Sequence, residues 1–154
     1  PYCQDNLTSW LDWKLLDTHR DIFEFCKYMI HFRHNHPAIR KSIAQSHCGF
    51  PPISQHGVTP WDDNFTQDSK IVCTMFAGHD EKQDSEDIVY LAVNPYWESI
   101  LIHLPKLPKP LQWHLAVDTS LSDTSGCTFE KEQMSHVGND YLIGARTVVV
   151  LTAH

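Results

Sequence analysis

The second half of the chain consists of short apolar runs separated by polar turns, a pattern typical of a β-rich domain. The runs lie at residues 71–76, 88–93, 100–104, 113–117, 141–143 and 147–151, and a polar loop is predicted at 122–126. Two of them, 71–76 and 88–93, are almost continuously apolar, as strands buried on both faces are. About six or seven short strands joined by turns are typical of a sandwich. We therefore predict a mainly β fold, with an antiparallel β-sandwich over residues 70–154.

Ahead of this β region, residues 18–35 have the pattern of one long helix. Pro37 predicts its end, because proline disfavours helical geometry in the residue before it. Its apolar residues would cover more than half of the helix circumference: Ile22, Phe23, Phe25, Cys26, Tyr28, Met29, Ile30 and Phe32. A helix on the surface of a single domain usually has a narrower apolar stripe. This helix is therefore predicted to need partners on two or three sides.

Residues 46–69 separate the helix from the β region. Their glycines and prolines disfavour long regular elements. However, Phe50, Ile53, Trp61 and Phe65 make the segment too apolar for a flexible linker, so an ordered connecting loop is predicted. The predicted organisation is thus an N-terminal loop and helix (1–45), a connecting loop (46–69) and a β-sandwich domain (70–154).

The opening residues 2–13 combine amide and carboxylate side chains with two tryptophans. Such loops often bind ligands, because they offer hydrogen bonds and flat apolar faces together. The same residue types are also good helix caps, and the tryptophans could pack in a core. Asp5, Asn6 and Trp10 are the candidate binding residues, whereas capping and core roles are expected for Asp12 and Trp13.

Composition narrows the class of protein. The 154 residues are 42% hydrophobic and 20% charged, enough to bury a core. A formal charge of −7 disfavours binding to nucleic acids or to anionic membranes. The chain contains no apolar run of about 18 residues that could span a bilayer. Its five scattered cysteines suggest reduced thiols and a cytoplasmic location. Because Pro1 stands in place of an initiator Met, we expect a piece of a longer protein, either naturally processed or artificially cut.

The residues alone predict no active site. There is no nucleophile elbow, no Gly-rich phosphate loop, and no acidic pair placed at the end of a barrel strand. Among eleven histidines, His31, His34 and His36 are closest together, but a solvated helix face is favoured because no cysteine or carboxylate completes a zinc spacing. We therefore expect no metal ligands and no cofactor.

Aromatic residues in the β region leave one binding possibility. Trp113 lies on an alternating apolar face and is expected in the core. Tyr96 and Trp97 lie at a corner between two strands, where they could either pack in the sandwich or stack on sugar rings. The sequence leaves both interpretations open.

Four segments carry long motifs: YCQDNLTSWLDW from Tyr2, GFPPISQHG from Gly49, NPYWE from Asn94 and WHLAVDT from Trp113. Together they resemble the C-terminal end of bacterial glycogen-debranching enzymes, the isoamylase-like branch of the α-amylase superfamily. The resemblance covers most of the chain. Leu7 departs from the family pattern, in which a Glu is common at this position.

The resemblance implies that residues 1–45 are the last loop and helix of a catalytic β/α barrel, followed by an α-amylase-type C-terminal domain. The family's catalytic Asp, Glu and Asp would lie upstream of residue 1. The chain is then expected to be a non-catalytic part of a glycosidase acting on α-1,6 branch linkages of glycogen or starch, needing no cofactor. It would stabilise the barrel, and Asp5, Asn6 and Trp10 would line the rim of the substrate cleft.

Other functions remain open. The β-domain could be an independent α-glucan-binding module that uses Tyr96 and Trp97, or the terminal domain of a pullulanase or related enzyme. The expected partners are an α-glucan, the missing barrel, or a second copy of the chain bound through the exposed helix.

Overall fold

The computed structural model describes residues 2–121 and 127–154; the predicted 122–126 loop lies outside them. The chain begins with α1 (Leu15–Thr18) and α2 (Arg20–Asn35), followed by the short 3₁₀ helix η1 (Pro37–Ile39). Eight strands are found in the described residues: β1 (Ile53–His56), β2 (Val72–Asp80), β3 (Ser85–Asn94), β4 (Ile100–His103), β5 (Trp113–Asp118), β6 (His136–Val137), β7 (Asp140–Ile143) and β8 (Thr147–Ala153). A second 3₁₀ helix, η2 (Lys131–Gln133), precedes β6. The prediction of a mainly β, antiparallel fold is confirmed.

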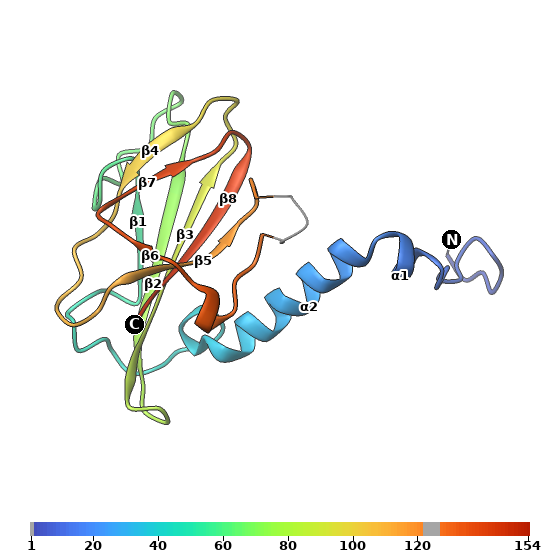
Figure 1. Cartoon of the computed structure of the whole chain (residues 1–154), viewed down its shortest axis with the longest axis horizontal. Helices are drawn as coiled ribbons and strands as arrows, with labels where there is room; N and C mark the ends of the chain where they lie inside the picture. Colours follow the sequence, from blue (N-terminus) through green and yellow to red (C-terminus); the bar gives the residue numbers. More distant parts are fainter. Residues whose placement is uncertain (1, 122–126) are drawn as a thin grey trace.

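The strands form two antiparallel sheets (Figure 1). The larger sheet has the order β1-β2-β3-β8-β5-β6, and the smaller consists of β4 and β7. Two of these strands were not predicted. β1 lies inside the connecting segment and pairs with β2, Ile53 opposite Phe76. β6 has only two residues and pairs with the start of β5.

The first apolar core fills the space between the two sheets. Ile102 of β4 and Ile143 of β7 are completely buried against residues of the large sheet such as Met75, Tyr90 and Leu151. Trp113 is 4% exposed and donates its indole N–H to the carbonyl of Pro105 at 2.9 Å. The prediction that Trp113 is a core residue is therefore confirmed.

The second apolar core lies on the opposite face of the large sheet and is covered by α2. Phe32 of α2 is 5% exposed and packs with Val89, Ala116, Val117 and Val150. Residues of both cores therefore alternate along the same strand. In β3, for example, Tyr90 belongs to the first core and Val89 to the second. This arrangement explains why residues 88–93 read as an uninterrupted apolar run.

Polar contacts fix the C-terminal half of α2 to the sheet. The Tyr28 hydroxyl donates to the carbonyl of Phe129 at 2.7 Å, and burial together with the nearby Glu130 charge raises the pKa of Tyr28 to about 12. At the helix end, His36 Nδ1 lies 2.6 Å from Oδ1 of the buried Asp87, whose second oxygen accepts the Ala38 N–H at 2.8 Å. These contacts define the position of α2 where it ends.

The N-terminal half of α2 projects away from the sheets, and α1 and the N-terminus continue in the same direction (Figure 1). Every residue from 2 to 24 is exposed. Ile22, Phe23 and Ile30 are 58%, 47% and 62% exposed, so the wide apolar surface of α2 is covered on one side only. None of the helices in the described residues combines the length and apolar character needed to cross a membrane.

Candidate functional site

The predicted binding residues fall into two groups that the fold does not bring together. Asp5, Asn6 and Trp10 belong to the N-terminal arm, which extends beyond α1 (Figure 1). Tyr96 and Trp97 lie in the corner between β3 and β4, on the sandwich. Each group is therefore described separately.

The N-terminal arm is held by local hydrogen bonds. The Trp10 indole N–H donates to Asp5 Oδ1 at 2.6 Å, and Asn6 Oδ1 accepts the Thr8 N–H at 2.9 Å. These bonds close a turn that precedes α1, and they do not cap this helix. Trp10 is 58% exposed, which leaves most of its ring free for contact with another molecule.

Neither expected role, capping for Asp12 or core packing for Trp13, is found in the structure. Asp12 Oδ1 accepts the Lys14 N–H at 3.0 Å, but Lys14 is the N-cap residue of α1 and no side chain caps this helix. Trp13 is 73% exposed, so the expectation that it is a core residue is wrong for this chain. The reason is that α1 packs on no sheet, and nothing in the described residues covers this ring.

Asn94 holds the β3–β4 corner in place. Its side-chain amide is almost completely buried and donates to the carbonyls of Glu98 and Gly144 at 2.9 and 2.8 Å. Its oxygen accepts the Tyr96 N–H at 3.0 Å. Since a buried amide with all these partners is costly to displace, the corner is a rigid support for the two aromatic rings.

Tyr96 and Trp97 form an aromatic pair with ring centroids 4.0 Å apart. The Lys70 ammonium lies 4.2 Å from the Tyr96 centroid, in cation–π contact, so it covers part of this half-buried ring. Trp97 is 65% exposed and has the more accessible aromatic surface. Of the two predicted stacking residues, Trp97 is thus the better suited to meet a flat ligand.

An open cavity of about 470 Å³ lies beside Tyr96, and Trp97 is not among its lining residues. Tyr96, Lys70 and Glu98 line it from one side, and Asp62, Asn64 and Asp68 line it from the connecting segment. Carboxylates, an amide and an ammonium next to an aromatic ring are groups that hydrogen-bond hydroxylated ligands. Sequence reasoning did not find these lining residues, because nothing in the local pattern shows that the connecting segment folds back towards the corner.

The histidines that lie close together in space are not those that lie close together in the sequence. His31 and His34 are exposed on α2, as predicted for a solvated face, whereas His36 is bound to Asp87. Among the described residues, one group has the ligand types and proximity of a metal site: His47, His79 and Glu86. These residues are far apart in the sequence, so no spacing motif indicates them.

The two antiparallel sheets form a β-sandwich, as predicted for an α-amylase-type C-terminal domain. No family model matches the chain. Isoamylase 1, chloroplastic, of Arabidopsis thaliana is 28% identical over 130 residues, 82% of this chain. The isoamylase of Pseudomonas amyloderamosa is 24% identical over 143 residues, 93% of this chain. A glycogen debranching enzyme of Erwinia tasmaniensis is 48% identical over 40 residues, 26% of this chain and 6% of that protein.

These similarities confirm the predicted resemblance to isoamylases and glycogen debranching enzymes over most of the chain, at low identity. The name of the Erwinia relative gives glycogen debranching as that protein's activity. The chain spans only 15% and 18% of the length of these two isoamylases.

Proposed function

We propose that the chain is a C-terminal module of a glycoside hydrolase that acts on α-1,6 branch linkages of glycogen- or starch-type α-glucans. The module stabilises a catalytic β/α barrel and carries no catalytic residue itself. The similarity to isoamylases, the β-sandwich fold and the lack of catalytic motifs in the sequence support this assignment. A pullulanase or a related enzyme fits the same fold, but the relatives' names favour glycogen debranching.

The main structural support for the proposal is the exposed apolar face of α2. Phe23 and Ile30 are seven residues apart and therefore lie on one side of the helix. Both are largely exposed, as are Ile22 and the Trp13 ring in front of α1. Large apolar side chains gathered on one exposed surface mark an interaction site. The proposed occupant is a barrel, because the matched isoamylases contain more than four-fifths of their length outside the aligned part.

The proposal also includes the domain organisation, the cleft residues and the cellular location expected from the sequence. Residues 1–45 would be the end of the barrel, 46–69 the connection and 70–154 the C-terminal domain, with Asp5, Asn6 and Trp10 at the rim of the cleft. A cytoplasmic location is proposed because all five cysteines, which lie in the described residues, are free thiols.

The first test is enzymatic. The purified chain, incubated with pullulan or amylopectin, is expected to release no reducing ends, because the proposed module carries neither the acid nor the nucleophile needed for glycoside hydrolysis. A bacterial isoamylase serves as the positive control for the assay. Turnover by the chain that scales with its concentration would contradict the non-catalytic assignment.

The second test concerns the apolar face of α2. In sedimentation velocity, the chain alone is expected to self-associate with increasing concentration, because the face lacks its barrel partner. The double variant Phe23→Ser/Ile30→Ser is expected to remain monomeric. The matched control, Glu24→Ser/His31→Ser, changes exposed residues with the same spacing and should associate like the wild type.

A monomeric wild type over the whole concentration range would contradict the docking role of this face. Self-association that persists in the double variant would place the contact elsewhere on the molecule, which would also contradict the docking role of this face.

A second function is favoured by the corner site. The exposed Trp97 ring lies against Tyr96, which lines a cavity with both polar and apolar side chains. Such an arrangement can stack on a sugar ring while neighbouring groups bind its hydroxyls. The β-domain would then bind α-glucan independently of a barrel. This function is compatible with the first, because the corner and the exposed face of α2 belong to different parts of the fold.

Affinity electrophoresis in gels containing glycogen tests this second function. The chain is expected to be retarded, and Trp97→Ala to weaken binding by about tenfold or more, the loss of about 1.4 kcal/mol. Trp13→Ala is the matched control, since it removes another exposed tryptophan that lies on the N-terminal arm. Unretarded migration of the wild type, or equal retardation of Trp97→Ala, would exclude glucan binding at the corner.

A further inference from the structure

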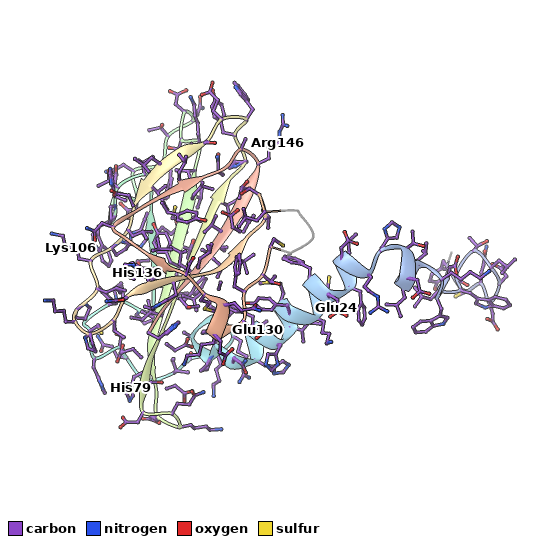
Figure 2. All side chains as sticks on the ribbon, in the orientation of Figure 1. Glu24, His79, Lys106, Glu130, His136 and Arg146 are labelled. Atoms are coloured by element: carbon purple, nitrogen blue, oxygen red, sulfur yellow. The ribbon has the colours of Figure 1, made fainter. Side chains whose placement is uncertain are left out.

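The lower end of the β2–β3 hairpin meets the loop that follows η1, and three side chains with metal-binding atoms converge there. His79 and Glu86 face each other across the β2–β3 ladder, and His47 comes from the loop. Figure 2 labels His79 at this end of the sandwich. One ligand atom of each residue lies within 4.8 Å of the other two.

The distances place the Glu86 carboxylate beside both imidazoles. Glu86 Oε1 is 3.3 Å from His79 Nδ1 and 3.8 Å from His47 Nδ1. The two imidazole rings are stacked, with centroids 4.1 Å apart. Around a tetrahedral zinc ion with bonds of about 2.0–2.2 Å, neighbouring nitrogen and oxygen ligands are separated by about 3.3 Å. The His79–Glu86 pair already has this separation, whereas the His47 ring must rotate out of its stack with His79 before one of its nitrogens can point at the same ion.

Two of the three residues are held in place by the fold. The His79 backbone N–H donates to the Ala44 carbonyl at 2.9 Å. Glu86 accepts the Ser46 hydroxyl and the His47 backbone N–H. The His79 and Glu86 side chains are 10% and 11% exposed, whereas that of His47 is 73% exposed. The site therefore has a rigid base and one movable ligand that is open to solvent.

We propose that His47, His79 and Glu86 bind one zinc ion, with water as the fourth ligand. Two imidazoles and one carboxylate suit zinc, whereas magnesium and calcium prefer sites built from oxygen ligands. The ion would connect the loop at His47 to the β2–β3 hairpin. This inference does not depend on the proposed glycosidase role, and it departs from the expectation, drawn from sequence spacing, that the chain has no metal ligand.

Isothermal titration of the tag-free chain, first treated with a chelator and then titrated with zinc chloride, tests the site. One zinc ion per chain is expected to bind, and magnesium chloride to give no binding. His47→Ala is the decisive variant, because its side chain is mostly exposed and its loss leaves the fold intact. It is expected to weaken zinc binding by about tenfold or more, as is Glu86→Gln.

His136→Ala is the matched control. His136 is also exposed and lies on β6, away from His79 (Figure 2). It should leave zinc affinity unchanged. Thermal unfolding gives a second readout: zinc is expected to raise the midpoint of the wild type and of His136→Ala but not that of His47→Ala. Absence of zinc binding to the wild type, or equal binding by His47→Ala, would overturn the assignment.

Discussion

A single six-stranded sheet with two apolar faces determines most of this structure. The β4–β7 pair covers one face and α2 covers the other, so Tyr90 and Val89 are both buried although they are neighbours in β3. A sheet of this kind cannot leave either face in water without exposing a row of branched side chains. The C-terminal half of α2 is therefore part of the β-domain's core, while its N-terminal half has no such partner.

The sequence predicted the features that depend on local periodicity. The apolar runs predicted six of the strands in the described residues: β2, β3, β4, β5, β7 and β8. Pro37 predicted the end of α2, which the structure places at Asn35. β6 was missed because it has only two residues, and β1 because it lies in a segment rich in glycine and proline; both are defined by pairing with a strand distant in the sequence. Pairing across the sequence also explains why the position of Trp97 at a corner was predicted but the cavity next to that corner was not, nor the approach of His47 to His79. Such contacts arise from topology, which one-dimensional spacing does not encode.

The functional surfaces are distributed over three parts of the molecule. The apolar side of the projecting half of α2 faces outward and suits a large protein partner. The β3–β4 corner presents aromatic rings next to an open cavity, and the hairpin end gathers nitrogen and oxygen ligands. The structural and binding roles proposed above therefore fall on separate surfaces of the molecule.

The role of α2 as the cover of the second sheet face is tested most directly by comparing two phenylalanines of the same helix. Phe32 is 5% exposed on the sheet and Phe23 is 47% exposed in the projecting half. In chemical denaturation of dilute protein, Phe32→Ala should lower the free energy of unfolding by about 3–5 kcal/mol. Phe23→Ala should change it by less than about 1 kcal/mol. Equally small changes in both variants would show that α2 does not pack on the sheet in solution, which would contradict this account.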